Sequence, residues 1–213
     1  MVQQPNGKQR RDEIRRQAEF TALLSKLAKD LRTSKDGRPK KIEKLKAALT
    51  DNKHGLHSFQ AIPLPLDARL SIVGVDAEKS TIFKSNLFPL RLQLKTADGG
   101  EYPLIFKNGD DLRQDQLVLQ LFTLMDRLLR KENLDLKILP YKVLATTAID
   151  GMVQFVPSAT IGAICSLSSE HGGSILAYLR MHHPDSKSPS TFGISPEVFD
   201  TYIRSCGESV LLV

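Results

Sequence analysis

The chain has 213 residues, of which 41% are hydrophobic and 25% charged, as in an ordinary globular protein. No apolar run approaches the roughly 18 residues of a membrane-spanning helix. The N-terminus lacks the apolar core of a signal peptide. Two cysteines are too few for a disulfide framework, and this low number fits a reducing cytosolic setting. The net charge of +6 favours acidic partners, but no zinc-finger spacing or aromatic-rich RNA-binding motif is present, so we expect no nucleic-acid binding.

The N-terminal part of the chain reads as two helices. Apolar residues spaced by three and four predict a helix over about 10–32, and Asp36-Gly37-Arg38-Pro39 ends it; the apolar positions are Ile14, Phe20, Leu23, Leu24, Leu27 and Leu31. A shorter helix is predicted over 42–49, followed by a polar loop over 51–58, where we place the main boundary. Basic pairs such as Arg10-Arg11 mark either a solvated helix face or a membrane-surface anchor.

From about residue 60 the pattern changes to strands. Residues 62–66 are extended because each proline excludes its predecessor from helical conformations. Strands are predicted at 70–75, 90–94 and 102–107, and the last two form a hairpin around Asp98-Gly99-Gly100. A long helix is predicted over 110–131, with its apolar stripe buried against the sheet. Two more strands follow at 141–145 and 151–156, and then helical pieces around 175–181 and 197–205.

The strand at 102–107 ends in a lysine that is a candidate for binding phosphate. Side chains alternate along a strand, so Ile105 and Lys107 share one face. Asn108-Gly109 then turns the chain, and Asp115 falls in the second turn of the next helix, from which a carboxylate can reach back to Lys107. A lysine held in this way is a suitable partner for phosphate oxygens. Taken singly, Lys107 and Asp115 fit solvated surface residues better than binding residues, and only their combination favours a phosphate site.

The stretch Ile105-Phe-Lys-Asn-Gly-Asp-Asp-Leu-Arg-Gln-Asp115 resembles the ATP-lysine strand and helix of the phosphatidylinositol kinase superfamily. Further segments resemble its class III branch, the vacuolar-sorting type that phosphorylates phosphatidylinositol itself: Asp36-Gly-Arg-Pro-Lys-Lys41, Ile62-Pro-Leu-Pro-Leu66, Leu128-Leu-Arg-Lys-Glu-Asn-Leu-Asp-Leu-Lys137 and Pro140-Tyr-Lys-Val-Leu-Ala145. The similarity covers most of residues 14–206, with a divergent stretch from about 165 to 192.

The resemblance implies a set of ATP-binding residues. Lys107 would contact the nucleotide phosphates, Asp115 and Tyr141 would form the polar inner wall, and Ile105 would line the adenine slot. A short loop over the phosphates would contain Phe83, Lys84 and Ser85; it is not glycine-rich, and no Walker or Rossmann pattern occurs. The backbone of a hinge formed by Gln154, Phe155 and Val156 would pair with adenine.

The family's catalytic loop and magnesium ligands would lie in Asp-Arg-His and Asp-Phe-Gly, and neither triplet occurs in the 213 residues. We therefore expect no catalytic and no metal-binding residue here, and an inactive chain when it is alone. We interpret the abrupt divergence after Cys206 as an alternative or mispredicted exon. His182-His183 has no ligand spacing that would indicate a metal site.

The expected fold class is α+β: a protein-kinase-like small lobe, with a twisted antiparallel sheet and one long helix, preceded by a helical segment and with the large lobe mostly missing. The expected domains are a helical junction (1–58), a small lobe with hinge (59–156) and the start of a large lobe (157–213). The implied function is transfer of the ATP γ-phosphate to the 3-hydroxyl of phosphatidylinositol, with ATP and magnesium, on endosomal or autophagic membranes and with accessory regulatory subunits. The alternative is a non-catalytic binding module or membrane-surface anchor.

Overall fold

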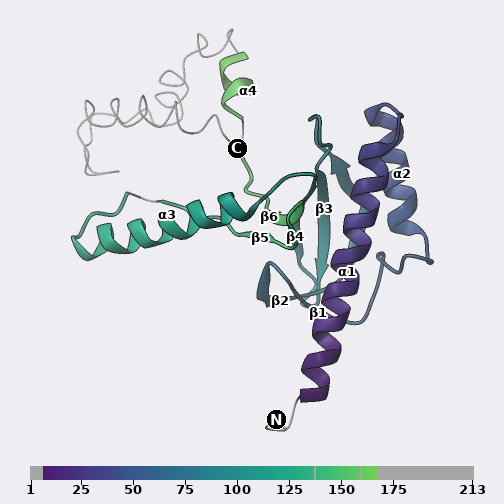
Figure 1. Ribbon diagram of the computed structural model, residues 1–213, viewed down its shortest axis with the longest axis horizontal. Coiled ribbons are helices and arrows are strands. Elements are labelled where there is room, and N and C mark those ends of the chain that lie inside the picture. Colours follow the sequence, from purple (N-terminus) through teal and green to yellow (C-terminus); the bar gives the residue numbers. More distant parts are fainter. Residues whose placement is uncertain (1–6, 137, 159, 167–213) are drawn as a thin grey trace. The chain divides into compact units, whose positions relative to one another are not determined.

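The structure of the chain is a computed structural model that describes residues 7–136, 138–158 and 160–166 (Figure 1). The chain separates into two compact units, Met1–Val156 and Pro157–Val213. The helical pieces predicted at 175–181 and 197–205 lie outside the described residues. A search of the described helices finds none that is long and apolar enough to cross a membrane.

The first unit begins with two helices, as predicted. Helix α1 (Gly7–Thr33) and helix α2 (Arg38–Thr50) are joined by a short turn in which Gly37 is the N-cap of α2. Pro39 occupies the first turn of α2, where its missing N–H costs no hydrogen bond, so the sequence that ends α1 also starts α2. The apolar face of α1 is buried from Phe20 onward, whereas Ile14, predicted to belong to that face, is 65% exposed.

The two helices precede a six-stranded antiparallel sheet with the strand order β1-β2-β3-β4-β6-β5. The strands are β1 (Ile62–Leu64), β2 (Asp67–Ile82), β3 (Leu90–Thr96), β4 (Glu101–Asn108), β5 (Val143–Ala145) and β6 (Asp150–Gln154). The predicted hairpin at 90–107 is confirmed: β3 and β4 pair from Leu90↔Phe106 to Lys95↔Glu101. Strand β2 runs beyond the predicted 70–75, and its register with β3 shifts between Asp76 and Thr81.

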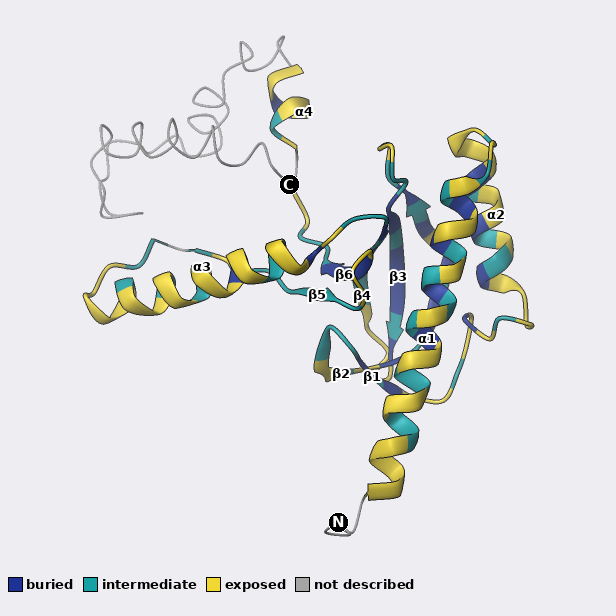
Figure 2. Cartoon of the chain, viewed as in Figure 1, coloured by how far each residue is buried: buried dark blue, intermediate teal, exposed yellow. Residues whose placement is uncertain are grey.

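One face of the sheet forms a single hydrophobic core with α1 and α2 (Figures 1 and 2). The helices contribute Phe20, Leu24 and Leu45, and the ring of Phe20 lies 5.5 Å from that of Phe59 at the start of the sheet region. In β4, Leu104 and Phe106 are fully buried in this core, whereas Ile105 and Lys107 are half-buried. The predicted alternation along β4 is therefore confirmed, and its second face points away from the core.

Helix α3 (Arg113–Lys131) forms where predicted, but the prediction that its apolar stripe is buried against the sheet is wrong. Leu119 is the buried residue of α3, and Figure 2 shows the helix exposed along most of its length. Seven large apolar side chains are 43–58% exposed: Leu117, Val118, Leu121, Phe122, Leu124, Met125 and Leu128. The physical reason is that α3 packs on β5, a strand of three residues, which offers too little surface to cover the stripe.

The predicted α+β class is confirmed, because the sheet is antiparallel and its strands do not alternate regularly with helices along the chain. A short helix, α4 (Ile161–Ser166), belongs to the second unit.

Candidate functional site

Lys107 lies near the end of β4, on the face of the sheet that points away from the core. Its amino group is 3.1 Å from a carboxylate oxygen of Asp110, and 23% of its side chain is exposed. In the pairing of β4 with β6, Lys107 stands opposite Gly151. A Cβ at Gly151 would lie 2.6 Å from the carbonyl oxygen of Leu144 and 2.6 Å from Leu112 Cδ1. Beside Lys107, the sheet thus has no room for a second side chain.

The expected pairing of Lys107 with Asp115 is wrong, because Asp110 holds the lysine. Among the described residues no ion pair joins Lys107 to Asp115. The helix begins at Arg113 rather than at about 110, so Asp115 lies in its first turn and Asp110 lies in the preceding loop, three residues beyond the lysine. The helix start therefore decides which carboxylate meets the amino group.

A glycine turn brings the chain from Lys107 to Asp110. Gly109 has φ +94°, a backbone conformation that L side chains rarely adopt. A Cβ on Gly109 would also lie 2.0 Å from Nη1 of Arg32, so the guanidinium of α1 sits directly against this turn. The Gly109 N–H is bonded to the carbonyl oxygen of Ile149 at 2.6 Å, which ties the turn to the residue preceding β6. Lys107 is therefore followed by a tightly held loop.

Asp115 influences Tyr141 rather than Lys107. Burial raises the pKa of the Tyr141 phenol above its ordinary value, and the negative charge of Asp115 raises this pKa further. Tyr141 adjoins the predicted hinge, because the Gln154 N–H donates to Lys142 O at 2.8 Å and the Gln154 side-chain oxygen accepts from the Lys142 N–H at 3.1 Å. The structure thus brings Asp115, Tyr141 and Gln154 into one region.

The predicted phosphate loop and the predicted hinge also meet, although they are far apart in the chain. The rings of Phe83 and Phe155 have centroids 6.3 Å apart, and the Phe155 N–H donates to Pro103 O at 3.4 Å. Lys84 and Ser85 are exposed at the tip of the loop. The Phe83 N–H is bonded to Pro89 O at 2.9 Å, so the loop at 83–89 is closed by its own backbone.

The strand register places Ile105 and Lys107 on one face of the sheet together with residues of β3, β5 and β6. Ile105 of β4 lies opposite Arg91 of β3 and Val153 of β6, and Val153 lies opposite Val143 of β5. Residues directly opposite one another in an antiparallel pair share a face. This face is opposite to the one that packs against α1 and α2.

The chain was compared with known proteins. The family described as "Phosphatidylinositol 3- and 4-kinase" matches residues 101–211, just over half of the chain, including Lys107, Asp115, Tyr141 and Gln154. This chain belongs to the phosphatidylinositol 3- and 4-kinase family. The resemblance to this kinase superfamily drawn from the sequence is thereby confirmed, and the relatives named next confirm the resemblance to its class III branch.

Several phosphatidylinositol 3-kinases are similar to nearly the whole chain. Phosphatidylinositol 3-kinase pik3 of Schizosaccharomyces pombe is 49% identical over 201 residues, which is 94% of this chain and 25% of the relative. Phosphatidylinositol 3-kinase VPS34 of Arabidopsis thaliana is 48% identical over 199 residues, or 92% of this chain and 24% of the relative. The protein of that name in Saccharomyces cerevisiae is 41% identical over 199 residues, or 93% and 22%. The chain spans about a quarter of the length of these curated relatives.

In this family member the structure adds residues that the sequence did not single out. Asp110 was missed because nothing in the sequence fixes the start of α3 to a single residue. The guanidinium carbon of Arg91 lies 4.5 Å from the centroid of the Phe155 ring. Arg91 could have been identified from the predicted hairpin, because it pairs with the candidate residue Ile105 across the two strands.

A buried polar network behind Lys107 was also missed. The Asp150 carboxylate, 4% exposed, accepts hydrogen bonds from the Asn108 amide at 2.6 Å, the Ser25 hydroxyl at 2.8 Å and the Thr147 hydroxyl at 3.1 Å. These bonds join α1 to the ends of β4 and β6, next to the lysine. The contact between Ser25 and Asp150 spans 125 residues, and no local pattern in the sequence signals it.

Proposed function

We propose that residues 59–156 of this family member bind ATP as the small lobe of a phosphatidylinositol 3-kinase. The observation that carries the proposal is the position of Lys107, which lies at a strand end, is held by Asp110, and belongs to the segment that matches the family. An amino group that is already oriented can contact phosphate oxygens with little further loss of side-chain freedom. Residues 1–58 would be the helical junction and 157–213 the start of the large lobe.

The other proposed roles come from the resemblance to the family, and the contacts around Lys107 support some of them. Asp115 and Tyr141 would form the polar inner wall, Ile105 would line the adenine slot, and the backbone at 154–156 would pair with adenine. Phe83, Lys84 and Ser85 would cover the phosphates, and the ring contact of Phe83 with Phe155 supports placing this loop beside the hinge. Arg91 would stand next to the adenine end, because its guanidinium lies over Phe155.

Magnesium belongs to the reaction of the family, where it would neutralise phosphate charge. In the part of the chain that the structure describes, no group of three or more His, Cys, Asp or Glu side chains could hold a metal ion. The residues described here therefore do not fit a magnesium site, and we assign no step to the ion.

The parent reaction would transfer the ATP γ-phosphate to the 3-hydroxyl of phosphatidylinositol. The printed names of the relatives support this substrate, since they are phosphatidylinositol 3-kinases. We further propose that the protein acts peripherally on endosomal or autophagic membranes, in trafficking and autophagy, with accessory regulatory subunits.

Binding of a fluorescent ATP analogue to purified residues 1–213 tests the site. A hydrogen bond to a charged group contributes about 1.5–3 kcal/mol, so Lys107→Met should weaken binding by about 10- to 100-fold. Lys79→Met is the matched control, because that lysine pairs with Glu101 on the surface, away from the candidate site. Equal affinities of the two variants would contradict the assignment of Lys107.

A second assay separates nucleotide binding from phosphoryl transfer. We expect residues 1–213 alone to transfer no radiolabelled phosphate to phosphatidylinositol vesicles, because this polypeptide contains neither an Asp-Arg-His nor an Asp-Phe-Gly triplet. Lipid product above background that disappears in Lys107→Met would show that other residues of this chain supply the catalytic base and charge stabilisation.

A further inference from the structure

The lysine at position 41 is buried although it carries an ionisable group. Only 1% of Lys41 is exposed, which is rare for lysine because an amino group loses its hydration when it is buried. Within the described part of the chain no carboxylate lies at ion-pair distance from its Nζ. The side chain must therefore be held by other groups, and these groups indicate what it does.

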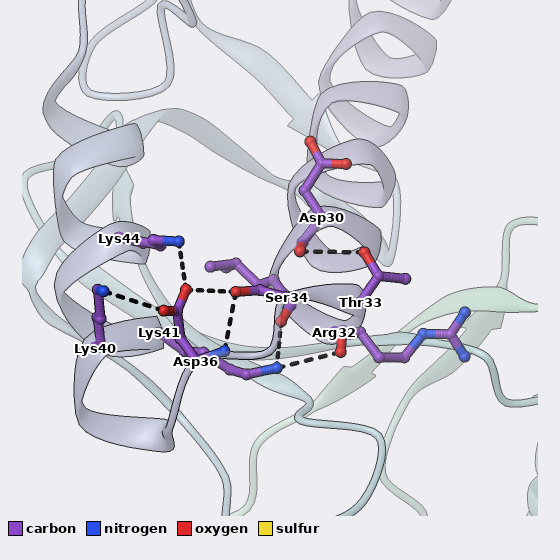
Figure 3. Close-up of polar contacts among 9 residues, drawn as sticks. Asp30, Arg32, Thr33, Ser34, Asp36, Lys40, Lys41 and Lys44 are labelled. Carbon is purple, nitrogen blue, oxygen red and sulfur yellow. Dashed lines mark hydrogen bonds and ion pairs between the residues drawn. The ribbon is translucent and has the colours of Figure 1, made fainter.

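Two of these groups are backbone carbonyls at the end of α1. The Lys41 amino group donates to Leu31 O at 2.5 Å and to Arg32 O at 3.2 Å; Figure 3 shows the bond to Arg32. Carbonyls in the last turn of a helix lack partners within the helix, and the negative end of the helix dipole favours a cation. Lys41, which belongs to α2, thus caps α1.

The third group is an aromatic ring that belongs to the candidate phosphate loop. Lys41 Nζ lies 4.0 Å from the centroid of the Phe88 ring, within the range of a cation–π contact. Phe88 has φ +49°, a left-handed conformation that is unfavourable for a residue with a side chain. Its N–H is bonded to Ser85 O at 3.2 Å, so the backbone of Phe88 is part of the loop. A strained residue persists only where its surroundings hold it, and Lys41 is one of its contacts.

Helix α2 also holds the other end of this loop. The Arg38 Nε–H donates to Ile82 O at 2.8 Å, immediately before Phe83. The first turns of α2 therefore contact the chain on both sides of the loop, at Ile82 through Arg38 and at Phe88 through Lys41. Lys40 and Lys44 differ from Lys41, because they pair with Asp36 at the surface (Figure 3).

We infer that Lys41 is a positioning residue for the loop at 83–89, whose place it sets through Phe88 while remaining too deeply buried to touch a nucleotide. The helical junction would thereby fix the height of Phe83, Lys84 and Ser85 above the phosphates. The consequence for ATP rests on the proposed function; the effect on the loop does not.

Amide hydrogen exchange of residues 1–213 tests the effect on the loop. In Lys41→Met, which keeps an unbranched apolar side chain, the amides of Phe83 and Phe88 should exchange about tenfold faster under conditions where the protein stays folded. Lys40→Met should leave both rates unchanged. Unchanged loop rates in folded Lys41→Met would overturn the inference.

Phe88→Leu separates positioning of the loop from capping of α1. In a Phe88→Leu background, Lys41→Met should no longer accelerate exchange in the loop, whereas the Ser34 amide, bonded to Asp30 O at the end of α1, should respond in both backgrounds. Equal acceleration of the loop in both backgrounds would overturn the inference. If Lys41→Met does not fold, the single variant Phe88→Leu tests the inference. Phe88→Leu should itself accelerate amide exchange in the loop, and an unchanged exchange rate of the loop amides would overturn the inference.

Nucleotide affinity is the second readout. Lys41→Met should weaken binding of a fluorescent ATP analogue several-fold, less than Lys107→Met does, while Lys40→Met should bind like the unmodified chain. Faster loop exchange with unchanged nucleotide affinity would overturn the link to the phosphates. A chain that binds no nucleotide at all but shows the exchange pattern would refute the proposed function and leave the positioning of the loop supported.

Discussion

At the scale of residues, the electrostatic effect of Asp115 on the pKa of Tyr141 is the interaction that is simplest to measure. Burial and the Asp115 charge both raise the pKa of Tyr141, so we expect Asp115→Asn to lower this pKa while leaving it above the ordinary value, because burial is the larger cause. Tyrosine ring carbon signals followed by NMR during a pH titration give the measurement, with Asp111→Asn as control. Because the pKa of Tyr141 is higher in the folded than in the unfolded chain, this residue does not change the free energy of unfolding below about pH 10. It lowers the free energy of unfolding as pH rises from there through the folded pKa. An unchanged Tyr141 pKa in Asp115→Asn would contradict the coupling.

At the residue scale, alternation along β4 was enough to place Ile105 and Lys107 on the same face of the sheet, opposite to Leu104 and Phe106. It could not identify the partner of Lys107, because Asp110 and Asp115 lie on either side of the start of α3. Whether a carboxylate belongs to a turn or to a helix depends on a shift of a few residues, and local sequence preferences rarely fix helix boundaries so closely. The pairing of Ser25 with Asp150 is set by tertiary packing alone.

At the scale of an element, α3 offers two leucines in the same helix with different surroundings. Leu119 is 8% exposed and Leu121 is 50% exposed. Leu119→Ala should lower the free energy of unfolding of residues 1–213 by about 2–3 kcal/mol, and Leu121→Ala by less than about 0.5 kcal/mol. Urea unfolding monitored by circular dichroism measures both. The same substitution in the same helix cancels differences in helix propensity. Equal losses would mean that the stripe of α3 is covered in solution.

Apart from α4 (Ile161–Ser166), which the sequence did not indicate, the sequence predicted the existence of the described helices and strands better than the contacts that each one makes. The apolar spacing in α3 predicts a helix with one apolar face, but it does not indicate what covers that face. The length of β2 was underestimated for a different reason: the Asp76 carboxylate bonds the backbone N–H of Glu78 at 2.9 Å, forming a local irregularity that reads as a turn although the strand continues to Ile82.

At the scale of the molecule, the helical segment and the sheet are joined by one core, although a polar loop separates them in the sequence. Leu24 and Leu45 are fully buried together with Leu92, Leu104 and Phe106 of the sheet. The loop at 51–58 is itself bonded to β2, since the Val75 N–H donates to Leu56 O at 2.9 Å. A change in composition thus marks a change in secondary structure here, and not the edge of a hydrophobic core.

This shared core leads to a prediction about which part of the chain folds. Residues 1–156 should fold cooperatively, because they form one compact unit. Residues 59–156 alone should not, since removing α1 and α2 uncovers the core face of the sheet, and each large side chain left exposed forgoes about 1.5–3 kcal/mol of burial. Leu24→Ala in residues 1–156 is the graded control: it should stay folded, with a free energy of unfolding lower by about 2–5 kcal/mol. Dispersed amide NMR signals from residues 59–156, together with a cooperative urea transition, would show that the sheet does not need the helices.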